Sequence, residues 1–205
     1  MKKLESTITN MVIVLVGVAL VTGSILAYVN HVTEEPIKLQ AEKSLADGIK
    51  AVMGGVELTV AKEDTVKQTA AGKELTFVIH ETVGKDSKPI GVAVESTTGG
   101  FGGDLKVLVG FDTDGNILGY TILQHSETPG LGAKADKWFQ KEGKGCVVGK
   151  NPAADKLSVK NDGGEIDAIT ASTITSRAFL LAVNQAYQAY KSMPVDAHTG
   201  ASGKH

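Results

Sequence analysis

The sequence contains few cysteine, proline and aromatic residues, and it has no large excess of charge of one sign. Cys146 is the single cysteine, which excludes an internal disulfide and a metal site built from cysteines alone. The formal net charge is −2, and no lysine cluster is interleaved with aromatic residues, so we expect no nucleic acid as a partner. No Ser-His-Asp set, paired carboxylates or group of metal ligands forms a visible motif, so we expect no catalytic residues and no metal site in this chain.

A long apolar run lies near the N-terminus. No charged residue occurs from Ser6 to Asn30, and as a helix the inner part from Met11 to Val29 would reach about 28 Å, close to the hydrocarbon thickness of a bilayer. We therefore expect a transmembrane helix over residues 9–30. A cleaved signal peptide is the alternative, but the run exceeds the usual apolar core and no Ala-x-Ala site follows it.

Charges beside this run predict its orientation. Lys2 and Lys3 precede it, whereas Glu34 and Glu35 follow it. Because cationic flanks stay in the cytoplasm, we expect residues 1–8 to be cytoplasmic and the remainder to lie on the outer, periplasmic side. The protein would then be a single-pass protein of the inner (cytoplasmic) membrane.

The rest of the chain is long enough for one compact domain. Imperfect helical spacing of apolar residues predicts a helical stalk over 31–55, and the domain itself is expected over 56–193. The tail, 194–205, is rich in small and polar residues without an apolar pattern, so we expect it to be disordered.

Alternating apolar residues predict an α+β domain with antiparallel hairpins and a C-terminal helix. Predicted strands cover residues 75–80, 90–94, 105–111 and 117–124. Asp114-Gly115 marks the turn between the last two. The segment from Asp112 begins like a calcium loop, but Ile117 and Leu123 occupy the positions that require glycine and glutamate, so we interpret it as a turn.

The segment Asp167–Ser176 places a cluster of hydroxyl side chains just ahead of an amphipathic helix expected to begin near Ile174. The free N–H groups and the dipole at such a helix start favour an anion such as phosphate, and Arg177 adds a positive charge. The simpler alternative is that one of these hydroxyl groups only caps the helix. The candidate capping residues are Thr170, Ser172 and Thr173.

A second segment, His125–Lys134, contains Pro129-Gly130 and Gly132. These residues predict a turn with positive φ that admits a flat ligand close to the backbone, although an ordinary turn would share the composition. Glu127 could accept a hydrogen bond from a ligand or from the protein.

Both segments resemble motifs of one family, in the same order along the chain. The first is similar to the pattern Asp-x-x-(Ser/Thr)-Gly-Ala-Thr-x-(Ser/Thr)-Ser, by which a flavin transferase recognises the G subunit of the Rnf complex and the C subunit of the sodium-pumping NADH:quinone oxidoreductase. The second resembles the Glu-Thr-Pro-Gly-Leu-Gly loop of the same FMN-binding domain. Ala171 departs from the pattern where Gly is usual, and Ser172 where Ala is usual. Gly99–Asp104 resembles a glycine-rich loop that lies near the cofactor in this family.

The resemblance implies FMN esterified through its phosphate to Thr173 by a separate flavin transferase. It further implies an electron-transfer subunit of a membrane complex, an ion-translocating oxidoreductase that couples ferredoxin and NAD redox chemistry to Na⁺ or H⁺ movement. The other Rnf subunits would be its partners, and the chain alone would not catalyse a reaction. Lys134 could favour a reduced, anionic flavin by its charge. Expected noncovalent FMN contacts are Glu127, Thr128, Leu131, Gly132 and Lys134, with Thr170, Ser172 and Thr175 near the phosphate.

Three alternatives remain open from the sequence. The length of 205 residues favours the Rnf subunit over the quinone-oxidoreductase subunit, whose exported domain tends to be larger. A membrane-anchored scaffold could keep the fold without flavin. A flavin domain could instead serve a different exported reductase.

Overall fold

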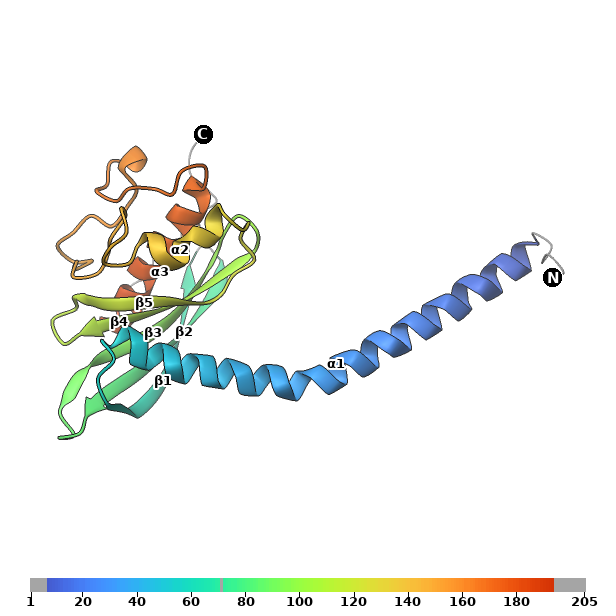
Figure 1. The fold of residues 1–205 in the computed structure, drawn as a ribbon, viewed down its shortest axis with the longest axis horizontal. Coiled ribbons are helices and arrows are strands. Elements are labelled where there is room, and N and C mark those ends of the chain that lie inside the picture. Colours follow the sequence, from blue (N-terminus) through green and yellow to red (C-terminus); the bar gives the residue numbers. More distant parts are fainter. Residues whose placement is uncertain (1–6, 71, 194–205) are drawn as a thin grey trace. The chain divides into compact units, whose positions relative to one another are not determined.

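The computed structural model describes residues 7–70 and 72–193 and divides the chain into two compact units at Ser44 and Leu45. Helix α1 runs from Ile8 to Val52 (Figure 1). Within the described residues it is the one helix that is long and apolar enough to cross a membrane, and its most apolar window is fully exposed. Pro36 lies inside it. The expected tail, 194–205, and most of the expected cytoplasmic segment lie outside the described residues.

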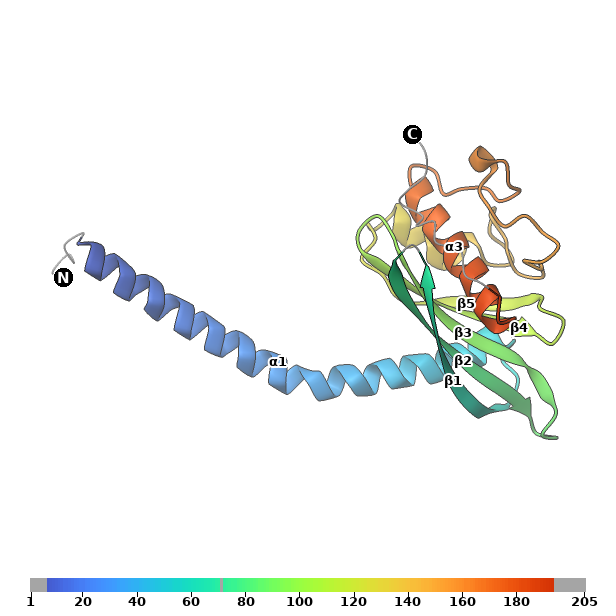
Figure 2. The same cartoon turned by 180° about the vertical axis from the view of Figure 1, so that it is seen from behind.

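The second unit contains a five-stranded antiparallel sheet in the order β1-β2-β3-β4-β5 (Figures 1 and 2). Its strands are β1 (Leu58–Ala70), β2 (Lys73–Gly84), β3 (Pro89–Gly99), β4 (Asp104–Asp112) and β5 (Ile117–Gln124). The expected hairpin of β4 and β5 is confirmed, with Asp112 closing the turn by accepting hydrogen bonds from the backbone N–H groups of Asp114 and Asn116. The α+β fold class is therefore confirmed.

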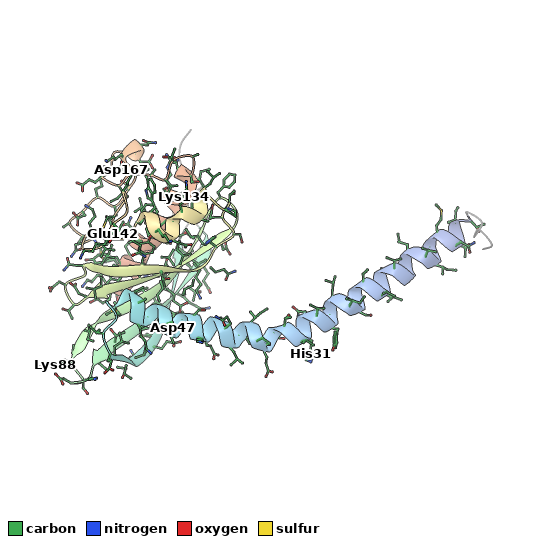
Figure 3. The ribbon with its side chains drawn as sticks, in the orientation of Figure 1. His31, Asp47, Lys88, Lys134, Glu142 and Asp167 are labelled. Carbon is green, nitrogen blue, oxygen red and sulfur yellow. The ribbon has the colours of Figure 1, made fainter. Side chains whose placement is uncertain are left out.

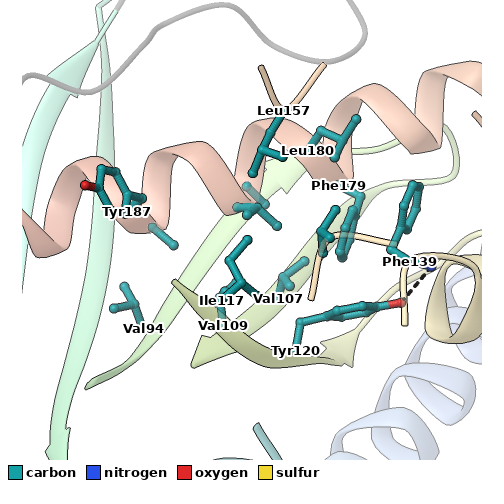
Figure 4. Packing of buried hydrophobic residues seen from close by; sticks show 14 of the residues in the cluster. Val94, Val107, Val109, Ile117, Tyr120, Phe139, Leu157, Phe179, Leu180 and Tyr187 are labelled. Atoms are coloured by element: carbon teal, nitrogen blue, oxygen red, sulfur yellow. Dashed lines mark hydrogen bonds between the residues drawn. The ribbon is translucent and has the colours of Figure 1, made fainter. Parts of the chain in front are cut away.

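Helix α3 (Thr173–Tyr190) covers one face of the sheet (Figure 2). The strands direct alternate apolar residues toward it, because successive side chains of a strand point to opposite faces. Val94, Val107 and Val109 face the helix in this way (Figure 4). The rings of Phe139 and Phe179 stack with centroids 4.2 Å apart, which continues the core beyond the end of the sheet.

Tyr120 connects this core to the segment after the sheet. Its hydroxyl donates to the carbonyl of Ala135 at 2.5 Å and accepts from the N–H of Phe139 at 3.2 Å (Figure 4). Burial raises the pKa of Tyr120 well above its usual range. The hydroxyl therefore stays protonated and holds the short helix α2 (Ala135–Trp138) against β5.

The last turns of α1 pack on the opposite face of the sheet. Ile49, Val52 and Met53 form a second buried cluster with Ala93 and Leu108. A Cβ atom at Gly110 would lie 2.5 Å from the Val52 carbonyl oxygen, and one at Gly119 would lie 3.1 Å from it. Glycine at these strand positions therefore lets the helix backbone approach closely.

The same face carries a buried charged group. Glu95 is only 5% exposed; its carboxylate lies 2.8 Å from His80 Nε2 and 2.5 Å from Lys106 Nζ. Burial acts to raise the pKa of Glu95, but hydrogen bonds and charge from His80 and Lys106 outweigh it and hold this pKa below its ordinary value. Three neighbouring strands are thereby joined by one polar group.

Candidate flavin attachment site

The hydroxyl cluster lies at the N-terminus of α3, which begins at Thr173. Ser172 occupies the N-cap position but makes no side-chain capping hydrogen bond. Ser176 instead fixes the preceding turn, because its hydroxyl accepts from the Ile169 N–H at 2.9 Å and donates to the Ser172 carbonyl at 3.0 Å. Thr173 is half-buried. The Ser172 side chain does not accept a hydrogen bond from the backbone N–H groups in the first turn of the helix.

Ala171 adopts a left-handed conformation with φ of +61°. Its methyl group is disfavoured there, and glycine would not be. The position at which the sequence departs from the Gly of the motif is therefore the one that needs positive φ.

Glu127 joins three segments that are distant in sequence. Its side chain is buried, and Oε2 accepts a hydrogen bond from the Thr175 hydroxyl at 2.7 Å. Oε1 accepts from the backbone N–H of Phe101 at 2.8 Å and of Gly102 at 3.3 Å. The proline loop (residues 125–134), the glycine-rich loop (residues 99–104) and α3 are thus tied to a single carboxylate.

Two glycines make room for this carboxylate. A Cβ atom at Gly100 would collide with Glu127 Oε1, and one at Gly132 would collide with Oε2 and lie 2.8 Å from the Thr175 hydroxyl oxygen. Both glycines therefore act through close packing, whereas Gly130, with φ of +76°, supplies the turn itself.

Two large apolar side chains remain exposed on the loops that Glu127 holds. Phe101 is 68% exposed and Leu131 is 40% exposed. The Leu131 loop is a tight turn, in which the Thr128 carbonyl accepts from the N–H groups of Leu131 and Ala133. An apolar surface of this kind on fixed loops suits a flat aromatic ligand.

Arg177 has a partner that the sequence did not reveal. Its guanidinium binds Asp162 with two hydrogen bonds of 2.7 Å, and this pairing raises the pKa of Arg177 and lowers that of Asp162. Arg177 thus keeps its positive charge on the first turns of α3, and its ion pair anchors the 160–162 turn to this helix.

A cleft of about 470 Å³ adjoins the proline loop. Its lining includes Gly130, Lys134, Trp138 and Glu142. Lys134 and Glu142 are labelled in Figure 3. Asp167, also labelled there, accepts at its carbonyl a 2.8 Å hydrogen bond from the Trp138 indole N–H. The cleft is thus connected to the segment that leads to Thr173.

The sequence is similar to those of known proteins. The family model of the FMN-binding domain matches residues 100–188. The G subunit of the ion-translocating oxidoreductase complex of Vibrio parahaemolyticus is 32% identical, over 80% of this chain and 81% of its own. The chain belongs to this G-subunit family. The G subunit of Shewanella baltica is 34% identical over 82% of each chain. The G subunit of the Na⁺-translocating ferredoxin:NAD⁺ oxidoreductase complex of Acetobacterium woodii is 31% identical over 88% of this chain and 90% of its own.

In this member of the G-subunit family, the expected site residues fall into two groups. Glu127, Gly132 and Thr175 meet in one buried cluster, so Glu127 accepts from the protein, one of the two options that the sequence left open. The others surround the start of α3 or the proline loop. Ser172 is buried and Thr173 half-buried, whereas Thr128, Leu131, Lys134 and Thr170 are exposed.

Sequence reasoning missed two residues of this site. Asp162 and Ser176 hold the segment around Thr173, yet neither was assigned a role. Ser176 could have been noticed as the hydroxyl four residues after Ser172, a spacing that reaches a helix carbonyl. Nothing local marks Asp162 as the partner of Arg177.

Proposed function

We propose that this chain is an electron-transfer subunit that carries FMN esterified to Thr173. It would act in a membrane complex that couples ferredoxin and NAD redox chemistry to Na⁺ or H⁺ translocation. The family membership and the matched FMN-binding domain support this proposal. The name of the Acetobacterium woodii relative supports the ferredoxin and NAD couple.

The observation that carries the proposal is the position of Thr173 as the first residue of α3. Because the Ser172 side chain makes no capping hydrogen bond, the first N–H groups of the helix remain for a phosphate ester. Thr170 and Ser172 lie on the turn just before it. The donor groups present therefore suit the phosphate end of FMN.

The ring end of FMN would lie by the exposed side chains of Phe101 and Leu131. Bound FMN supplies the capacity to take up and release electrons. The chain contributes apolar contact from these two side chains and positive charge from Lys134, while Thr128 and Gly132 set the loop. Glu127 and Thr175 position both loops against α3 and do not themselves need to touch the ring.

Attachment would require a separate flavin transferase. A threonine hydroxyl is a weak nucleophile unless a base activates it. In the part of the chain that the structure describes, no side chain accepts a hydrogen bond from Thr173. Thr173 is therefore proposed as the acceptor of the flavin and not as a catalyst.

The proposed arrangement places residues 9–30 of α1 in the inner membrane, with residues 1–8 in the cytoplasm. Residues 31–55 would be the stalk and 56–193 the FMN domain on the periplasmic side. The cation bias of the flanking sequence supports this orientation. The other subunits of the complex would be the partners of this chain.

A denaturing gel tests the attachment. Full-length protein made together with the transferase should show a fluorescent band at its own mass. Thr173→Ala should abolish the band and leave the fold intact, whereas the control Thr65→Ala, at an exposed threonine of β1, should keep it. A colourless wild-type protein, or an adduct that intact-mass and peptide analysis locate on another residue, would overturn the proposal. Purification of the native assembly then separates a multi-subunit complex from a lone exported reductase.

A further inference from the structure

Apart from Lys134, the residues that line the cleft beside the proline loop have no role in the FMN binding proposed above. The outer side of α2 and the turn at 142–144 form its walls. Ala133, Trp138 and the methylene groups of its lysines provide apolar surface. Its volume of about 470 Å³ is enough to hold one or two apolar side chains.

Hydrogen bonds to backbone carbonyl groups and close backbone packing hold the walls of the cleft in place. The Trp138 indole donates to the Asp167 carbonyl, and the N–H of Gly145 donates to the Trp138 carbonyl at 3.2 Å. A Cβ atom at Gly143 would collide with that same carbonyl oxygen. The cleft is therefore a preformed part of the fold.

The rim of the cleft is basic. Four exposed lysines lie between residues 134 and 144, and all but Lys141 line the cleft, against the two carboxylates of Asp136 and Glu142, in a chain whose formal net charge is −2. None of the four forms an ion pair with another residue of 7–70 or 72–193, whereas Lys62, Lys67 and Lys160 each have a carboxylate partner. These lysines are Lys134, Lys137, Lys141 and Lys144.

The position of the cleft suggests what occupies it. Gly130 and Ala133 belong both to the cleft and to the loop that carries Leu131, where the proposed function places the flavin ring. A protein that exchanges electrons with the flavin must come close to this loop. Complementary charge increases the rate of such encounters.

We propose that the cleft docks an acidic surface of the electron-transfer partner of this subunit. An apolar side chain of the partner enters the cleft, and flanking carboxylates pair with the four lysines. This inference rests on the proposed function, because it takes the flavin to lie beside Leu131.

Zero-length carbodiimide coupling in the native membrane complex tests the docking directly, because this reagent joins a lysine only to a carboxylate that already touches it. Peptide mapping should find the four lysines coupled to aspartate or glutamate of another protein of the complex, and high salt applied before coupling should reduce this yield. Lys88 and Lys156, exposed lysines elsewhere on the domain, should give no such product. Coupling only within this chain would overturn the proposal.

Charge reversal provides the functional test. The double variant Lys137→Glu/Lys144→Glu should slow electron transfer to or from the flavin about 10-fold or more at low ionic strength, with the difference narrowing at high salt. The control Lys88→Glu/Lys156→Glu should leave the rate unchanged. Both double variants should keep the fluorescent gel band, because neither changes Thr173. A wild-type protein without the band would count against the proposed flavin attachment and not against the docking. Equal electron-transfer rates in the two double variants would overturn the docking proposal. It would also be overturned if Lys137→Glu/Lys144→Glu lost binding to anionic lipid vesicles and kept its contact with the partner protein.

Discussion

The Glu127 carboxylate and the Thr175 hydroxyl form a buried hydrogen bond of 2.7 Å across 48 residues of sequence. The same carboxylate accepts backbone N–H groups from the glycine-rich loop. The residue expected to contact flavin is therefore a structural centre that sets the distance between both loops and the start of α3.

Replacement of Glu127 should destabilise the fold around the whole site. Glu127→Ala would leave two backbone donors and the Thr175 hydroxyl without their partner, so we expect a loss of about 2–3 kcal/mol in the free energy of unfolding. Thr175→Val, which keeps the shape and removes one donor, should cost about 1–2 kcal/mol. Urea unfolding of the full chain in detergent, followed by the fluorescence of Trp138, measures both. Thr170→Val, at an exposed threonine, is the control. If Glu127→Ala unfolds with the same free energy as this control, the structural role assigned to Glu127 is contradicted.

Adjacent glycines offer a matched pair for the packing around Glu127. A Cβ atom at Gly100 would collide with the Glu127 carboxylate, whereas one at Gly99 meets nothing within 4 Å. We expect Gly100→Ala to destabilise the protein by about 1–3 kcal/mol through overpacking, and Gly99→Ala to be close to neutral. Thermal unfolding compares the two, and equal midpoints would show that the carboxylate does not need this space.

The left-handed turn before Thr173 should be open to improvement. Ala171→Gly removes the unfavourable contact of a methyl group at φ of +61°, and we expect a gain of about 0.5–1 kcal/mol after the added chain entropy of glycine in the unfolded state. The fluorescent gel band should persist, since the backbone path is unchanged. A lower unfolding midpoint for this variant would contradict the conformation of Ala171.

Acid should weaken the sheet through Glu95. Because the folded protein holds the pKa of Glu95 below its ordinary value, the resulting stability is present above the unfolded pKa of about 4.5 and is lost as pH falls below it. Glu95→Gln should therefore cost about 1–3 kcal/mol at pH 7, and its difference from wild type should shrink between about pH 5 and pH 3.

Unfolding midpoints across this pH range test the assignment. Glu74→Gln removes a carboxylate whose pairing with Lys67 is exposed and provides the control. A constant difference between Glu95→Gln and wild type at every pH would exclude the carboxylate as its source.

Local pattern predicted the elements whose side chains alternate between core and solvent. The β4–β5 hairpin and the start of α3 were located in this way. Strand β1 was not predicted, because most of its side chains are exposed and its sequence has no sustained apolar alternation. Its pairing with β2 is made by backbone groups, which leave no trace in side-chain pattern.

The sequence by itself determined the apolar span, the order of the two motifs and the threonine proposed to carry FMN, because each depends on residues that are neighbours in the chain. Only the tertiary structure decided that Glu127 binds Thr175, that Asp162 forms an ion pair with Arg177, and that three lysines line a cleft beside the proline loop. Hydrogen bonds and ion pairs between distant segments depend on how the sheet and α3 pack, and local sequence pattern does not encode which polar groups that packing brings together.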